Sequence, residues 1–445
     1  MTADLVLRSQ RTILPDGERS AAVAIRDGRI LSIAPYDAHL AAAQDVDFGK
    51  LALLPGLVDT HVHVNEPGRT EWEGFASATR AAALGGVTTL IDMPLNSLPP
   101  TLDPEALDIK RKTALGQCFV DIGFWGGAVP GNAAYLAPLH AQGVFGFKCF
   151  LADSGVPEFP PVSRTEMEEA LRITAGLDSM LIVHAEDAET LAHSPDPNGP
   201  SYADFLASRP PEAETTAIAA VIEATRRTGG RAHILHLASA AALPLIARAK
   251  AEGVRITAET CPHYLTFAAE AIRDGATDHK CCPPIRSAED RERLWAALGE
   301  GLIDCVVSDH SPCTADLKRQ DTGDFGVAWG GIASLQLGLS AMWTEASDRG
   351  FVLGDVVDWM ARRTADLVGL SANKGRIAVG CDADLVVFDP DAHTTVHAAQ
   401  LAHKNPVTPY DGLRLRGVVQ ATYLAGAPVD PTRPTGQLLT KETQR

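Results

Sequence analysis

Two histidines separated by one residue, His61 and His63, follow a short apolar run at residues 53–58. A strand alternates its side chains between two faces, so this spacing places both imidazoles on the same face. Two imidazoles on one face at the end of a strand can provide half of a metal site. An isolated His-x-His is more often a polar pair in a surface turn, so the metal interpretation depends on further ligands downstream.

Further residues with suitable chemistry follow later apolar runs, and these are Lys148, His184, His236 and Asp309. A lysine inside an apolar run is unusual, because a buried ammonium is costly unless it is paired or neutral. Lys148 could pair with an acid across the fold, act as a Schiff-base amine, or react with carbon dioxide to form a carbamate. The carbamate is favoured, since its two oxygens could bridge two metal ions, whereas a Schiff-base enzyme has no use for four imidazoles.

Each of these residues, taken alone, also has an ordinary structural explanation. A single histidine after an apolar run, such as His184, is commonly a core residue, and Asp309 could cap a following helix. His233 and His236 lie three residues apart, and on a strand this offset places them on opposite faces. We therefore predict His236, at the end of the strand, as the ligand, and expect His233 to pack against a helix.

The elements that position these residues are predicted from short apolar runs that alternate with longer segments of helical periodicity. Eight strand candidates occur between residues 55 and 372, at residues 57–59, 88–92, 120–125, 146–150, 180–184, 233–236, 255–259 and 304–309. Eight such repeats predict an α/β fold, a (β/α)8 TIM-like barrel, in which functional residues lie at the C-terminal ends of the strands. A doubly wound open sheet is the alternative, but it would not so naturally use eight strands.

Both ends of the chain consist of short β-like segments separated by turns. Asp16-Gly17 and Asp27-Gly28 near the N-terminus are typical of hairpin turns. Residues 383–389 and 417–426 repeat the pattern near the C-terminus. We therefore expect residues 1–54 and 373–445 to form one small β-sandwich domain from both termini, with the barrel occupying residues 55–372.

Composition narrows the functional classes. The chain has 445 residues, of which 45% are hydrophobic and 21% charged, and its net charge is −17. These values are typical of a globular protein with a large core, and the acidic balance argues against binding to nucleic acid or anionic membranes. The eight cysteines include no Cys-x-x-Cys pair, and neither an export signal nor an apolar stretch of membrane-spanning length is evident. We expect a cytoplasmic protein with reduced thiols.

The motifs together resemble those of the cyclic amidohydrolases, the dihydroorotase and hydantoinase group of the amidohydrolase superfamily, and most closely the allantoinases. The resemblance runs nearly from end to end. Its anchors are residues 55–63 (PGLVDTHVH), 66–74 (EPGRTEWEG), 146–150 (GFKCF), 259–264 (ETCPHY), 282–286 (CPPIR), 308–313 (SDHSPC) and 329–332 (WGGI).

This resemblance implies a centre of two divalent ions bridged by a carbamylated lysine, N6-carboxylysine, at position 148. One ion would be held by His61, His63, Lys148 and Asp309, and the other by the same Lys148 with His184 and His236. Zinc is the usual metal, although nitrogen and oxygen ligands would also accept cobalt, manganese or nickel. The resemblance also implies a homotetramer.

Departures from related motifs suggest the substrate. Asn65 stands where dihydroorotases have an arginine for the substrate carboxylate, and Asp153 stands where hydantoinases and dihydropyrimidinases typically have a tyrosine. The resemblance thus implies hydrolysis of the cyclic amide of allantoin to allantoate. A hydantoinase or dihydropyrimidinase is the alternative. A non-catalytic assembly protein on the same scaffold is less favoured, because such relatives have lost metal ligands that this chain keeps.

The expected chemistry is attack by water on a polarised ring carbonyl. We expect Asp309 to take a proton from the attacking water and deliver it to the departing ring nitrogen, first as base and then as acid. Substrate contacts are expected from Asn65, from the backbone around Cys282 and Gly330, and from the hydroxyl of Ser311.

Overall fold

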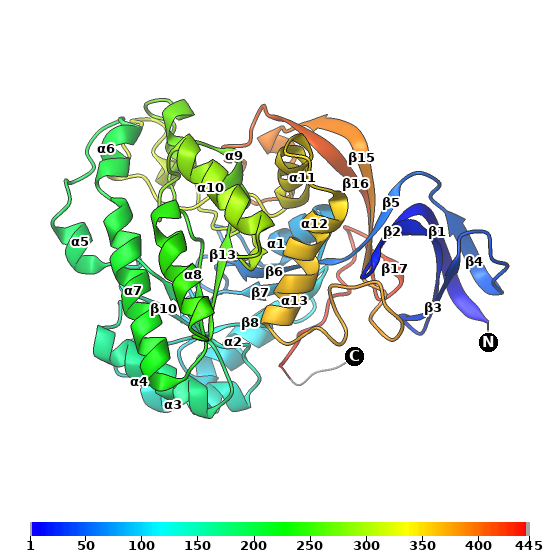
Figure 1. Ribbon diagram of the computed structural model, residues 1–445, viewed down its shortest axis with the longest axis horizontal. Helices are drawn as coiled ribbons and strands as arrows, with labels where there is room; N and C mark the ends of the chain where they lie inside the picture. Colours follow the sequence, from blue (N-terminus) through cyan, green and yellow to red (C-terminus); the bar gives the residue numbers. More distant parts are fainter. Residues whose placement is uncertain (1, 442–445) are drawn as a thin grey trace.

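The structure is a computed structural model that describes residues 2–441 (Figure 1). The N-terminal strands lie at one end of the molecule, the C-terminal strands lie beside them toward the centre, and the middle of the chain forms the larger remaining part. The functional residues predicted from the sequence belong to this larger part.

Parallel strands form the centre of the middle region. They are β6 (Leu57–Val62), β7 (Val87–Asp92), β8 (Asp121–Phe124), β9 (Gly126–Gly127), β10 (Phe147–Phe150), β11 (Leu181–His184), β12 (Ala232–Ile234), β13 (Ile256–Thr260) and β14 (Cys305–Val306). β6 to β8 pair in chain order, as do β9 to β14. β8 and β9 follow each other in one segment, which pairs with β7 on one side and β10 on the other.

A parallel bridge between Val62 and His310 links the end of β6 to the residues that follow β14. With this bridge, the first and last strands are neighbours, which is the strand order of a (β/α)8 barrel. The predicted fold class is confirmed. The predicted strand at residues 304–309 is shorter in the structure, because only Cys305 and Val306 pair as a strand.

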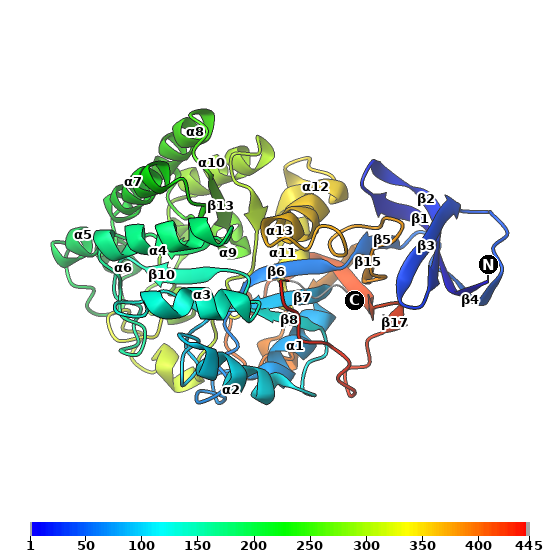
Figure 2. The same cartoon turned by 90° about the horizontal axis from the view of Figure 1, so that it is seen from below.

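Helices lie outside these strands in both views (Figures 1 and 2). They are α1 (Phe75–Leu84), α2 (Pro104–Ala114), α3 (Ala133–Ala141), α4 (Arg164–Gly176), α5 (Ala188–Ala192), α6 (Tyr202–Ala207), α7 (Pro211–Thr228), α8 (Leu243–Ala251), α9 (Pro262–Thr266), α10 (Ala288–Gly299), α11 (Gly338–Asp348), α12 (Leu353–Val357) and α13 (Arg363–Leu367). Local chemistry sets several of their ends. A proline opens α7 and Gly229, in the left-handed conformation, closes it, whereas Ser163 and Glu166 form a capping box at α4.

Strands from both termini form a second, mixed sheet. They are β1 (Ala3–Leu14), β2 (Gly17–Arg26), β3 (Arg29–Pro35), β4 (Ala42–Asp47), β5 (Ala52–Pro55), β15 (Leu385–Thr395), β16 (Arg414–Leu424) and β17 (Ala427–Pro428). Their order is β17-β16-β15-β5-β1-β2-β3, with β4 paired to β1. The antiparallel pairing of β5 with β15 joins the two ends of the chain, as the sequence patterns predict.

Gly56 lies between the last residue of β5, in the terminal sheet, and the first residue of β6, in the barrel. A side chain at this position would place its Cβ 2.1 Å from the hydroxyl oxygen of Thr88, so the close approach requires glycine. The apolar run at residues 53–58 is therefore divided, since β5 belongs to the terminal sheet and β6 opens the barrel. His61 lies in β6, and His63 follows its last residue.

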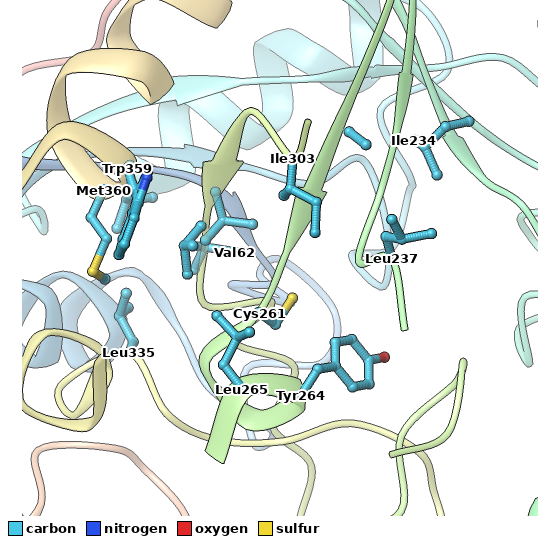
Figure 3. Close-up of a cluster of buried hydrophobic side chains, with 14 of the residues drawn as sticks. Val62, Ile234, Leu237, Cys261, Tyr264, Leu265, Ile303, Leu335, Trp359 and Met360 are labelled. Carbon is cyan, nitrogen blue, oxygen red and sulfur yellow. The ribbon is translucent and has the colours of Figure 1, made fainter. Parts of the chain in front are cut away.

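Buried side chains hold the strands in place. Figure 3 shows part of the main hydrophobic cluster, in which Val62 of β6 and Ile234 of β12 lie with Ile303, Leu335 and Trp359. Close packing of this kind fixes strand positions, and hence the positions of the side chains at the strand ends.

A buried lysine joins the barrel to the terminal sheet. The Lys374 ammonium lies 2.7 Å from Asp121, at the start of β8, 2.9 Å from Asp382 and 2.6 Å from Asp384. All four side chains are at most 3% exposed. Among residues 2–441, no helix combines the length and apolar character needed to cross a bilayer.

Candidate metal centre

The six predicted ligands meet at the C-terminal ends of the barrel strands. Lys148 Nζ lies 3.4 Å from Nε2 of His61 and also 3.4 Å from Nε2 of His63. His184 Nδ1 is 3.0 Å from His236 Nε2, and Asp309 Oδ1 is 3.1 Å from His61 Nε2. The same-face arrangement expected of His61 and His63 is thus confirmed.

Three residues near the centre adopt a left-handed backbone conformation that is uncommon outside glycine. The φ angles are 38° at His236, 43° at Asp309 and 64° at Asn65. Such conformations cost about 1–3 kcal/mol and concentrate at functional sites. Here they turn the chain just beyond β12, β14 and β6, and the side chains of His236 and Asp309 face the centre.

Hydrogen bonds select the nitrogen that each histidine presents to the centre. Nδ1 of His61 lies 2.5 Å from Oε1 of Glu259, and Nδ1 of His63 lies 2.9 Å from the carbonyl oxygen of Leu95. Both histidines therefore present Nε2. His184 is held the other way, since its Nε2 lies 2.7 Å from Oε2 of Glu186, which leaves Nδ1 facing His236.

Burial sets the protonation states. It lowers the pKa of His61, His63 and His236 well below the ordinary value, and the nearby charge of Lys148 acts in the same direction. Burial also lowers the pKa of the Lys148 amine and raises the pKa of the Asp309 carboxyl. Neutral imidazoles are the form that binds metal, and a neutral amine is the form that reacts with carbon dioxide.

The donor set fits a divalent metal centre. Ligand atoms of His61, His236 and Asp309 all lie within 4.8 Å of one another, in the barrel interior. Imidazole nitrogens together with carboxylate oxygens suit zinc and related first-row ions.

The expectation for His233 is wrong. Its ring bonds to the neighbouring strand β13: its Nε2 lies 2.9 Å from Oε2 of Glu259 and its Nδ1 lies 2.7 Å from the hydroxyl of Thr257. Because β12 ends at Ile234, His236 lies beyond the strand, and the alternation of faces along a strand does not extend to it. His236 therefore faces the centre directly, while His233 contacts Glu259, which in turn contacts His61.

Glu259, Glu186 and Arg209 also support the centre, and the sequence patterns predict no role for them. Arg209 Nη1 donates to Glu186 at 2.5 Å. Burial alone would raise the pKa of Glu186, but Arg209 and His184 more than offset it and bring that pKa to about 2. The sequence does contain a clue to both acids, because Glu259 lies within the predicted strand at residues 255–259 and Glu186 follows His184 by two residues.

A cavity of about 340 Å³ opens over the centre. Five of the six predicted ligands line it, all except His61, and so do three of the predicted substrate-contact residues, Cys282, Ser311 and Gly330. Its volume suits a small ring compound. Asn65 is not among the lining residues, because its side chain accepts from Asn96 Nδ2 at 3.0 Å and donates to the carbonyl of Pro312.

Known proteins resemble the chain closely. A sequence profile of the Amidohydrolase family matches residues 52–429. The allantoinase of Streptomyces avermitilis is 56% identical over 444 residues, covering 99% of both chains. The allantoinase of Saccharomyces cerevisiae is 51% identical over 379 residues, covering 84% of this chain and 82% of the relative. The structure of the L-hydantoinase (dihydropyrimidinase) from Arthrobacter aurescens superposes with a TM-score of 0.92 at 31% identity, covering 98% of this chain and 100% of that one.

Proposed function

Because the chain belongs to the amidohydrolase family, we propose that it hydrolyses the cyclic amide of allantoin to give allantoate. The resemblance predicted from the motifs is confirmed, and the family identifies the chain as a hydrolase acting on cyclic amides. The observation that supports allantoin most strongly is the match to an allantoinase over almost the whole of both chains.

For the metal centre, we propose that Lys148 is carbamylated and bridges two divalent ions. His61, His63 and Asp309 would complete the shell of one ion, and His184 and His236 that of the other. Support comes from the position of Lys148, whose amine lies at hydrogen-bonding distance from both His61 and His63. Zinc is the expected metal, with cobalt, manganese and nickel as alternatives. When bound, such ions would lower the pKa of a water molecule and polarise the ring carbonyl.

Asp309 is the proposed catalytic acid and base. Its carboxyl is buried and lines the cavity, and burial raises its pKa, so that it can hold a proton near neutral pH. It would accept a proton as the water oxygen bonds to the ring carbon. It would then return that proton to the ring nitrogen as the carbon–nitrogen bond breaks, which leaves a carboxylic acid and a free ureido nitrogen.

We propose that the bound ring contacts the backbone at Cys282 and Gly330 and the hydroxyl of Ser311. All three residues line the cavity beside Asp309. A direct contact from Asn65 stays a prediction. The amide of Asn65 contacts Asn96, which does line the cavity.

The test is ring opening of allantoin, hydantoin and dihydrouracil by the purified protein, before and after treatment with a chelator. We expect allantoin to be preferred, activity to disappear with the chelator, and zinc, cobalt, manganese or nickel to restore it. Preference for hydantoin or dihydrouracil would support the second candidate, a hydantoinase or dihydropyrimidinase, which the structural similarity to the Arthrobacter enzyme favours. No turnover of any ring by metal-loaded protein would support a non-catalytic assembly protein.

We further propose a cytoplasmic homotetramer that binds a small molecule and neither nucleic acid nor membrane. The eight cysteines are free thiols and seven of them are buried, which fits a reducing compartment. Light scattering coupled to size-exclusion chromatography would measure the mass of the assembly, and a monomeric mass would contradict the tetramer.

A further inference from the structure

Lys318 is a buried lysine that the proposed metal centre does not use. It ends the short 3-10 helix η4 (Ala315–Lys318), and it is 3% exposed. Its ammonium donates to the carbonyl oxygens of Gly331, Trp329 (3.1 Å) and Lys280 (3.4 Å). An ammonium has three N–H donors, so the three acceptors satisfy it. Within residues 2–441, no carboxylate lies within ion-pair distance of this ammonium.

These three carbonyls belong to two segments that form one wall of the cavity. Cys281 and Cys282 line the cavity from one segment, and Trp329, Gly330 and Gly331 line it from the other. The N–H of Gly331 also donates to the carbonyl of Lys280 at 2.8 Å. Lys318 therefore ties together, from behind, the two backbone segments proposed to contact the substrate.

The orientation of the Trp329 carbonyl decides where the next N–H points. In a trans peptide unit the C=O and N–H bonds point in opposite directions. Because the Trp329 carbonyl faces Lys318, the N–H of Gly330 points away from Lys318. Lys318 does not line the cavity whereas Gly330 does, and the Gly330 N–H donates to no acceptor in the described part of the chain. That donor is thus available to a bound molecule.

We propose that Lys318 is a positioning residue for the substrate, which holds the Trp329 and Gly331 carbonyls so that the Gly330 N–H meets a carbonyl oxygen of the bound cyclic amide. This inference rests on the proposed ring-opening function. It adds a residue outside the cavity that sets how tightly the ring binds, while the metal ligands remain independent of it.

The test is Lys318→Met, which keeps the length of the side chain and removes its N–H donors. We expect KM for allantoin to rise about tenfold, since a hydrogen bond to the ring is misaligned, while kcat and bound metal change far less. Lys250→Met is the matched control. Lys250 donates to the carbonyl of Leu302 and to Asp304, none of which lines the cavity, so KM should be unchanged. An unchanged KM in Lys318→Met, or a rise that follows loss of metal, would overturn the proposal.

Two further measurements cover the cases in which Lys318→Met does not fold or allantoin is not the substrate. If Lys318→Met does not fold, Lys318→Gln retains two N–H donors and should give a smaller rise in KM, whereas an unchanged KM would overturn the proposal. If the wild-type protein opens hydantoin or dihydrouracil instead of allantoin, the substrate assignment fails. The same KM comparison on that ring then decides the role of Lys318 separately.

Discussion

Nδ1 of His61 and Oε1 of Glu259 lie 2.5 Å apart, although 198 positions separate the two residues in the chain. The other oxygen of the same carboxylate lies 2.9 Å from His233, which in turn contacts Thr257. This buried series of side chains runs behind the centre along β12 and β13. It holds His61 in the tautomer that presents Nε2, and it raises the basicity of the imidazole as a ligand.

Glu259→Gln should weaken metal binding. A glutamine has one acceptor oxygen and no negative charge, so it cannot offer a carboxylate oxygen to both His61 and His233. We expect the affinity for metal to fall about 10- to 100-fold, measured by metal retained after dialysis against graded chelator. The exposed Glu252→Gln is the control and should retain metal as the wild type does. Equal retention by all three proteins would show that Glu259 has no part in holding the ligand.

Lys148→Ala should abolish ring opening, because it removes the proposed bridge. If the bridge is a carbamate, small carboxylic acids such as acetate can enter the vacated space and supply the two missing oxygens. We expect part of the activity and of the bound metal to return with increasing acetate. Intact-protein mass spectrometry of the wild type should show the added mass of carbon dioxide. Absence of that mass in fully metal-loaded, active protein would contradict carbamylation.

Asp309→Asn should show whether the proton-transfer role of the carboxyl, rather than the size of the side chain, is needed for catalysis. Asparagine has nearly the same size but cannot accept and return the proton, so kcat should fall about 100- to 10,000-fold. Because Asp309 is also a proposed ligand, kcat must be expressed per protein with measured metal content. A kcat close to that of the wild type in metal-loaded Asp309→Asn would rule out its role as base and acid.

Stability of the metal-free protein should decrease as the pH falls. Burial lowers the pKa of His63 in the folded state, whereas the unfolded imidazole binds a proton near pH 6.5. The unfolded state therefore takes up more protons, so the contribution of His63 is complete above about pH 6.5 and is lost below it. His63→Asn should reduce the slope of the unfolding free energy against pH by up to about 1.4 kcal/mol per pH unit between roughly pH 6.5 and 5. Identical slopes in urea titrations of both proteins would contradict this assignment.

Lys374→Met should destabilise the whole fold. The substitution removes the buried ammonium that the carboxylates of Asp121, Asp382 and Asp384 share. We expect a loss of about 3–5 kcal/mol in the free energy of unfolding, measured by urea titration. Lys112→Met is the control, because Lys112 is 74% exposed and forms an ordinary ion pair with Asp108, so its loss should cost less than about 1 kcal/mol. Similar losses in the two variants would show that the buried cluster adds no stability.

Local sequence patterns predict the helices and strands of this protein well where proline and glycine mark the same ends that the hydrophobic periodicity indicates. Residues 211–228, which have helical periodicity in the sequence, form α7, and the helix begins at a proline and is followed by a glycine. The strand candidates at residues 88–92 and 180–184 match β7 and β11 to within one residue at either end. Agreement is weaker where few residues pair, as at β14, which has only two paired residues in the expected segment 304–309.

The six candidate ligands and the barrel that brings them together could be predicted from local patterns alone, since parallel strands place their C-terminal ends at one face whatever the details of packing. The residues that support those ligands are visible only once the chain is folded. Glu259 contacts His61 across 198 positions and Arg209 contacts Glu186 across 23, while Lys318 reaches the Trp329 carbonyl 11 positions away. No local period encodes such contacts, because they depend on where each strand ends and which way the chain turns after it. His233 is an example. Because β12 ends at Ile234, His236 can face the centre from beyond the strand, and His233 can face the barrel interior as well.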